Sequence, residues 1–180
     1  MATFTDHPSG LLFTEKYPVV TRTYKDYKNL NPLLEQVIRK QGDRVFRKSN
    51  VKAQMTEWQM NKESGGEHFQ KISDFACEVS IDISPVTILP RVNDIWGAVY
   101  RKGDYTIPHE HWPALWSFCY YVNVSEKCSP LLFTSNNHQI KPENGMLVLF
   151  PGFVKHEVPI QQCDHERVMI AGNITLVDTL

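Results

Sequence analysis

The chain lacks an excess of either charge and lacks any apolar run long enough to cross a membrane. Nineteen Lys and Arg against twenty Asp and Glu give a net charge of −1, which argues against a broad electrostatic surface for nucleic acid or anionic lipid. The longest apolar stretch, 145–154, is about half the length that a membrane helix needs. The first residues lack a basic segment followed by an apolar one, so we expect no signal peptide. These absences predict a protein with neither nucleic-acid nor membrane partners.

Cysteine is scarce and shows no paired motif. The four cysteines of the 180-residue chain contain no C-x-x-C pair, and a chain of this size can bury a core without disulfides. We therefore expect reduced thiols in a cytoplasmic protein, with Cys77 and Cys119 as small core residues. Internal repeats and flexible linkers are also lacking, so the sequence predicts one domain over 1–180.

The first part of the chain, 1–80, favours helices and a few short strands. A helix is predicted over 31–41, with Asn31 as its cap and Pro32 in its first turn. A second helix is predicted over 67–79, where apolar residues recur on one face. Short strands are expected around Pro18, and the weak alternation that starts at Val51 is typical of an edge strand. We interpret 1–80 as a helix-containing support region.

The second part, 81–180, has short apolar runs separated by Gly, Pro and Asn turns. Such a pattern is typical of a β-sandwich or barrel. With helices only in the first part, the sequence predicts a β-rich α+β fold whose N-terminal helices pack on one face of a β core. The predicted strands are 82–89, 95–101, 105–111, 115–124, 130–134, 138–141, 145–150, 155–160 and 166–177.

Three histidines form a candidate metal site. His109 and His111 are separated by one residue, so on a strand both imidazoles share a face and Glu110 faces the other way. His156 follows an apolar strand and a Pro-Gly turn, which would bring a third imidazole from a neighbouring strand. Three ligands on one side of a transition metal leave the open positions that catalysis requires.

A candidate anion-binding residue lies further along the chain. Arg167 starts an otherwise apolar strand, and a buried guanidinium is costly unless it meets an anion. Its fork fits a carboxylate through two hydrogen bonds. A salt bridge to an internal Asp or Glu is the alternative. Asn173 shares the face of Arg167 on this strand and is expected to line the same pocket.

The segment from Trp96 to Ile174 resembles the Fe(II)/2-oxoglutarate-dependent oxygenases, specifically the prolyl-4-hydroxylase-like branch and its small phage and bacterial relatives. The resemblance is carried by the stretch around His109, the Cys-Tyr-Tyr-Val-Asn run that ends at Asn123, and the ten residues that separate His156 from Arg167. It implies a double-stranded β-helix, the jelly-roll fold of the cupins, as the core over 81–180.

The resemblance also implies an activity. Fe(II) would be held by His109, His111 and His156, and 2-oxoglutarate would chelate the iron while Arg167 binds its distal carboxylate. With O2, decarboxylation of 2-oxoglutarate would be coupled to oxidation of a substrate. The expected enzyme is a dioxygenase, a hydroxylase of a peptide, an amino acid or another small molecule, and the sequence does not choose among these substrates.

The chain departs from the family pattern at two places. His111 stands where the family has Asp or Glu, so the site uses three histidines or else two histidines without His111. Met169 stands where the family has a serine that helps to hold the cosubstrate. Tyr121 matches the tyrosine that contacts 2-oxoglutarate in the family and could compensate, and Tyr100 matches another tyrosine of the pocket.

Two other functions remain open at this stage. A cupin-type metalloenzyme with three histidines would use the same metal without 2-oxoglutarate, and would not need Arg167. A non-catalytic β domain that binds a ligand would need neither the metal nor Arg167.

Overall fold

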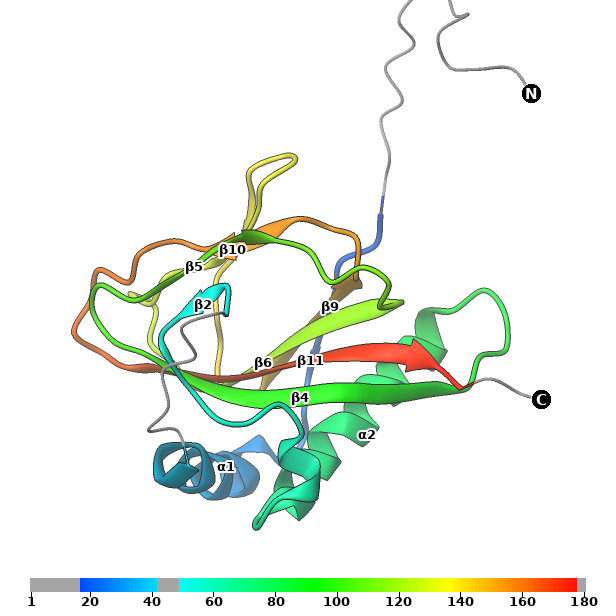
Figure 1. Cartoon of the computed structure of the whole chain (residues 1–180), viewed down its shortest axis with the longest axis horizontal. Coiled ribbons are helices and arrows are strands. Elements are labelled where there is room, and N and C mark those ends of the chain that lie inside the picture. Colours follow the sequence, from blue (N-terminus) through cyan, green and yellow to red (C-terminus); the bar gives the residue numbers. More distant parts are fainter. Residues whose placement is uncertain (1–16, 42–48, 178–180) are drawn as a thin grey trace, which may run out of the picture.

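Two antiparallel β-sheets face each other, and two helices cover the outer face of the larger sheet (Figure 1). The computed structural model describes residues 17–41 and 49–177. The six-stranded sheet has the order β1-β9-β6-β11-β4-β3 and the five-stranded sheet the order β2-β5-β10-β7-β8. The larger sheet consists of β1 (Val20–Thr23), β3 (Gln54–Met55), β4 (Pro90–Tyr100), β6 (Trp116–Asn123), β9 (Met146–Pro151) and β11 (Arg167–Leu176). The smaller sheet consists of β2 (Val51–Lys52), β5 (Tyr105–His109), β7 (Leu131–Phe133), β8 (His138–Ile140) and β10 (His156–Val158).

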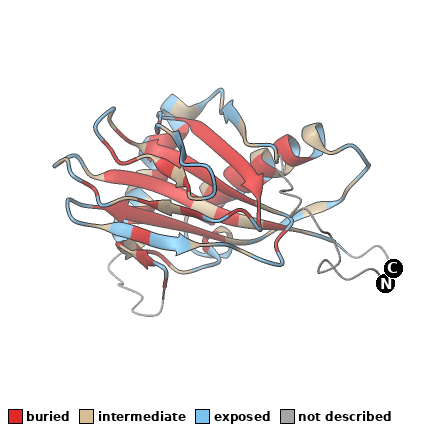
Figure 2. Ribbon diagram, turned by 90° about the horizontal axis from the view of Figure 1, so that it is seen from above, coloured by how far each residue is buried: buried red, intermediate tan, exposed pale blue. Residues whose placement is uncertain are grey.

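This arrangement is a double-stranded β-helix, and it confirms the expected β-rich fold. The central strands of the larger sheet are buried on both faces, as Figure 2 shows. Along β6, Tyr120 packs into the core under the helices, whereas Cys119 and Tyr121 pack into the core between the sheets. The alternation of a strand therefore supplies two separate cores from one segment.

The first helix, α1 (Tyr27–Gln41), begins four residues before its predicted start. Asp26 precedes it, and its backbone carbonyl accepts from the backbone N–H of Leu30 at 3.1 Å, the first i to i+4 bond of the helix, which places Asp26 at the cap position. The predicted role of Asn31 as the cap is therefore wrong. Asn31 is buried in the second turn, where it donates to the carbonyl of Val122 at 2.6 Å and accepts from the Tyr120 hydroxyl at 2.7 Å. Pro32 lies inside the helix rather than in its first turn.

The second helix, α2 (Gly66–Ile83), follows a short 3₁₀ turn, η2 (Met60–Lys62). The predicted helix over 67–79 is confirmed and continues further. Its buried face includes Phe69, Ile72, Ala76 and Val79, and it packs on β4. The predicted strand over 82–89 is wrong, because Asp82 and Ile83 end this helix and a loop leads to β4.

The remaining predicted strands all occur; most are shorter than predicted, but β4 begins at Pro90 instead of residue 95, and β9 continues to Pro151. β5 stops at His109 rather than at residue 111. The part of the chain before residue 81 also contributes three short strands, so it completes both sheets besides carrying the helices.

All four cysteines are free; Cys119 is buried and Cys77 is half-buried beside β4, so the prediction of Cys77 as a core residue is wrong. Among the described residues, no helix has the length and apolarity to cross a membrane.

Candidate metal centre and anion pocket

The three histidines lie together at one end of the space between the sheets. β10 runs antiparallel to β5, and His156 is the register partner of His109. The ring centroids of this pair are 4.4 Å apart, and His111 lies 4.7 Å from His109 and 5.2 Å from His156. One ring nitrogen from each residue lies within 4.8 Å of the others. The strand pairing therefore brings together residues that are 47 positions apart in the sequence.

His111 reaches this cluster from just beyond the end of β5. Its backbone N–H donates to the carbonyl oxygen of Gly152 at 2.7 Å, which ties the segment to the Pro-Gly turn after β9. A Cβ atom at Gly152 would lie 2.2 Å from the carbonyl oxygen of Ala114, so only glycine permits this close approach. The Pro-Gly turn before His156 thus also positions His111.

Hydrogen bonds orient two of the three imidazoles. Nδ1 of His109 lies 2.8 Å from the carbonyl oxygen of Ile107, and Nδ1 of His156 lies 2.9 Å from that of Val154. Because a carbonyl only accepts, each Nδ1 carries the hydrogen and each Nε2 keeps a free lone pair. Sequence reasoning did not foresee these backbone partners, which lie two residues before each histidine.

The surroundings keep all three imidazoles neutral. Burial lowers the pKa of His109, and burial together with the neighbouring His109 lowers the pKa of His111 to about 4. The same causes lower the pKa of His156 to about 3. Neutral imidazoles are the form that binds metals, so the cluster is ready to bind at neutral pH.

Arg167 is the largest completely buried side chain of the described residues, with 0% of its surface exposed. Its guanidinium carbon lies 4.9 Å from the ring centre of Tyr100 and 5.1 Å from that of Tyr121. None of its three nitrogens has a hydrogen-bond partner among the described residues. The internal salt bridge that the sequence left open is therefore not present there, and the cation is stacked on aromatic rings with its donors free.

The two predicted tyrosines lie beside Arg167. Tyr100 is its register partner on β4, and its hydroxyl lies 2.7 Å from Oγ1 of the buried Thr106. Tyr121 pairs in register with Met169, and its buried hydroxyl lies beside the Arg167 guanidinium without a hydrogen bond of good geometry to any described residue. Burial raises the pKa of both phenols, so both hydroxyls keep their protons. The hydroxyl of Tyr121 and the Arg167 guanidinium together offer unused donors to one anion.

Asn173 does not join this group. It lies six residues along β11 from Arg167, which is about 20 Å in an extended strand, and its Oδ1 accepts from Ser117 Oγ at 2.9 Å. Ser117 lines the cavity that contains the three histidines, so Asn173 supports the wall of that cavity rather than contacting Arg167.

Three residues that line the cavity of the histidines were not predicted from the sequence. Trp96 lies with its ring 6.3 Å from that of His111, Phe150 lies 4.6 Å from His156, and Thr106 holds Tyr100. Trp96 and Tyr100 share a face of β4, so strand parity was a signal that could have identified Trp96. The cavity that these residues line has a volume of about 30 Å³, which is room for only a few water molecules.

Comparisons with known proteins identify the fold. No family model matches the chain, and no curated protein matches its sequence. A prolyl-4-hydroxylase from Pseudomonas putida is similar in structure, with a TM-score of 0.69, 17% identity and coverage of 90% of this chain and 94% of that one. A viral collagen prolyl hydroxylase from Paramecium bursaria Chlorella virus-1, in complex with 2-oxoglutarate, is also similar, with a TM-score of 0.63 and 15% identity. The match covers 87% of this chain and 96% of that one.

A third similar structure is HygX from Streptomyces hygroscopicus with nickel and 2-oxoglutarate bound, with a TM-score of 0.65 and 9% identity. It covers 87% of this chain and 82% of that one. The chain therefore shares its fold with prolyl hydroxylases and with a protein crystallised with nickel and 2-oxoglutarate.

Proposed function

We propose that the protein is a non-haem Fe(II) dioxygenase that uses 2-oxoglutarate as its cosubstrate. The observation that carries the proposal is the combination of three adjacent neutral imidazoles with a buried guanidinium that has no anionic partner among the described residues. A metal site alone would also suit a cupin enzyme of another type. A fully buried, unpaired cation is explained by an anionic ligand, because such a charge is otherwise strongly unfavourable.

His109, His111 and His156 would hold the iron. Nitrogen ligands suit Fe(II), and three of them leave positions for further ligands. The carbonyl groups that accept from Nδ1 of His109 and His156 fix which nitrogen faces the metal. When bound, Fe(II) and 2-oxoglutarate would supply oxidation of a substrate C–H bond by O2, with succinate and CO2 as the other products.

Arg167 and Tyr121 would hold the distal carboxylate of 2-oxoglutarate. The guanidinium offers several N–H donors and Tyr121 offers one O–H donor, and none of them is used within the described protein. This hydroxyl takes the place of the serine that the family has where this chain has Met169. The narrow cavity implies that lining side chains such as Met169 move apart when the cosubstrate enters.

The substrate is proposed to be a peptide, an amino acid or another small molecule. Two similar structures are prolyl hydroxylases, which supports a substrate of this kind without selecting one. We also propose that the protein acts in the cytoplasm, and its four free cysteines support this location, since reducing compartments preserve thiols.

Thermal denaturation under nitrogen tests the proposal. Fe(II) and 2-oxoglutarate together should raise the melting temperature more than Fe(II) alone, because a ligand that binds only the folded state stabilises it. Glutarate, which lacks the 2-oxo group that chelates the metal, is the matched control and should give a smaller rise. A cupin enzyme without 2-oxoglutarate would respond to the metal only, and a non-catalytic domain would respond to neither ligand.

A further inference from the structure

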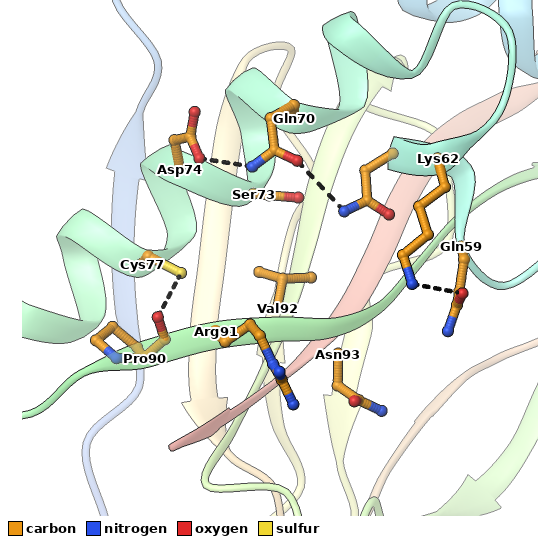
Figure 3. Close-up of a pocket in the computed structure, with 11 residues that line it drawn as sticks. Gln59, Lys62, Gln70, Ser73, Asp74, Cys77, Pro90, Arg91, Val92 and Asn93 are labelled. Carbon is orange, nitrogen blue, oxygen red and sulfur yellow. Dashed lines mark hydrogen bonds between the residues drawn. The ribbon is translucent and has the colours of Figure 1, made fainter. Parts of the chain in front are cut away.

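A second hollow lies on the outer side of the larger sheet, away from the histidines. It opens between α2, η2 and the first residues of β4 and has a volume of about 540 Å³ (Figure 3). The histidines, by contrast, lie between the two sheets, so the hollow and the candidate metal centre are separated by β4 and its neighbours. A volume of this size falls in the range of sites for small molecules.

The hollow exists because α2 presents small and polar side chains to β4 here. Gln70, Ser73, Asp74 and Cys77 follow the spacing i, i+3, i+4, i+7, which places them on one helical face. They line the hollow opposite Val92 of β4 (Figure 3). Apolar residues at these positions would fill the space and extend the core, so the polar stripe leaves a gap that a packed helix–sheet contact would close.

One hydroxyl on this wall is buried and unpartnered. Ser73 is only 2% exposed, and its Oγ has no hydrogen-bond partner among the described residues. A buried polar atom without a partner is unfavourable unless a ligand or water satisfies it. The hydroxyl of Ser73 therefore points to a polar occupant of the hollow.

The neighbouring amides are held in fixed orientations. Asp74 accepts from the Gln70 side chain at 2.7 Å, and Gln70 in turn accepts from the Asn61 side chain at 3.3 Å. This network uses one of the two N–H donors of the Asn61 amide and leaves the second oxygen of Asp74 outside it. The network prepares a polar wall before any ligand arrives.

The charge that remains in the hollow is positive. Lys62 on η2 lines it, and Arg91 of β4 lines its rim from the side of the strand opposite to Val92 (Figure 3), against the carboxylate of Asp74. The Lys62 ammonium donates to the side-chain oxygen of Gln59 at 2.9 Å, and an ammonium group carries two further N–H donors. Two cations and one partly used carboxylate favour a ligand with a negative charge.

We infer that this hollow binds a small polar molecule that carries a carboxylate or phosphate group. The anionic group lies by Lys62 and Arg91, and the polar remainder lies against Asn61 and Ser73. The site is independent of the metal centre, and it requires neither iron nor 2-oxoglutarate.

Nuclear magnetic resonance of the ¹⁵N-labelled full chain tests the inference. Inorganic phosphate and citrate are titrated separately at constant ionic strength, in the wild type and in Arg167→Met, so that binding between the sheets is recognised by its loss. Saturable amide shifts should appear at Lys62, Ser73 and Asp74 in both proteins. The probe that saturates at lower concentration tells a phosphate ligand from a carboxylate ligand.

Variants of the hollow provide the decisive comparison. Lys62→Ala and Arg91→Ala should each weaken binding about ten-fold, as the loss of one charged hydrogen bond does. Ser73→Val fills the space and should abolish the shifts without unfolding the chain. Lys71→Ala, an exposed lysine of α2 outside the hollow, is the matched control and should change nothing. Absence of saturable shifts for both probes, or equal effects of Lys62→Ala and Lys71→Ala, would overturn the inference.

Discussion

Arg167→Met is expected to raise the stability of the ligand-free protein while it removes the response to 2-oxoglutarate. The guanidinium is 0% exposed and has no anionic partner within the described chain. Desolvation of such an ion costs several kcal/mol. Stacking on the rings of Tyr100 and Tyr121 offsets about 1 to 2 kcal/mol per ring. Methionine has a similar length and no charge, so it can occupy the same space without this penalty.

The net gain for the ligand-free variant is about 2 kcal/mol by this reckoning. For a chain of this size it corresponds to a rise of about 4–8 °C in melting temperature. For the wild type, 2-oxoglutarate at about 100 times its Kd adds about 2.7 kcal/mol, and Arg167→Met should lose that addition. Differential scanning calorimetry of the metal-loaded and metal-free proteins, with and without 2-oxoglutarate, measures all of these quantities.

The control is Arg101→Met. Arg101 is more than half exposed and pairs with Glu166 at 2.8 Å, so its loss should change stability by less than about 1 kcal/mol and leave the response to 2-oxoglutarate intact. The reasoning is refuted if Arg167→Met is clearly less stable than the wild type without ligands, because the guanidinium then has a structural partner. It is equally refuted if that variant keeps the full response to 2-oxoglutarate.

Three further predictions concern the histidines and their supports. His111→Ala should weaken metal binding at least about ten-fold while His111→Asp largely restores it, since an acidic ligand stands there in the resembling family; calorimetric titration with Mn²⁺ measures both, and equal affinity of His111→Ala and wild type would show that His111 is not a ligand. Acidification should destabilise the metal-free protein from about pH 6.5 downward. The reason is that histidines of the unfolded chain bind protons there, whereas His111 and His156 in the folded protein, with pKa values of about 4 and about 3, stay neutral. Chemical denaturation at a series of pH values measures how the free energy of unfolding changes with pH, and a flat profile between pH 6.5 and 4 would contradict the prediction. Gly152→Ala should destabilise the protein by about 1–3 kcal/mol and weaken metal binding, because the new Cβ would lie 2.2 Å from the carbonyl oxygen of Ala114; unchanged Mn²⁺ affinity would show that this turn does not position His111.

The strands could be predicted from two patterns: alternation where one face of a sheet is buried, and a short continuous apolar run, such as Met146–Pro151, where both faces are buried. In 82–89 the alternation was misleading. Val79 and Ile83 continue the helical spacing of α2 and pack with it, so tertiary packing extended the helix through residues that favour a strand. The start of α1 was missed for a similar reason, since Asn31 has the chemistry of a cap but bonds across to β6 instead.

The histidine cluster and the Arg167 pocket could be predicted because each type of residue is informative by itself. An H-x-H pair and an arginine in an apolar strand are unusual enough to indicate chemistry. The sequence could not show which residues of neighbouring strands pair with one another. That His109 faces His156, and that Arg167 lies between Tyr100 and Tyr121, depends on which strands are neighbours. Asn173 shares a face with Arg167 but lies at the other end of the ten-residue strand β11, because a shared face does not imply proximity.

The most direct test of the proposed activity is the O2-dependent formation of succinate from 2-oxoglutarate by the Fe(II)-loaded protein, followed by nuclear magnetic resonance. The account predicts slow succinate formation even without the natural substrate. This formation should require Fe(II) and be lost in both His156→Ala and Arg167→Met, and it should persist in His138→Ala, whose exposed histidine lies on β8 outside the cluster. Succinate formation that is equal in the wild type and in Arg167→Met, or its complete absence from the iron-loaded wild type, would contradict the account.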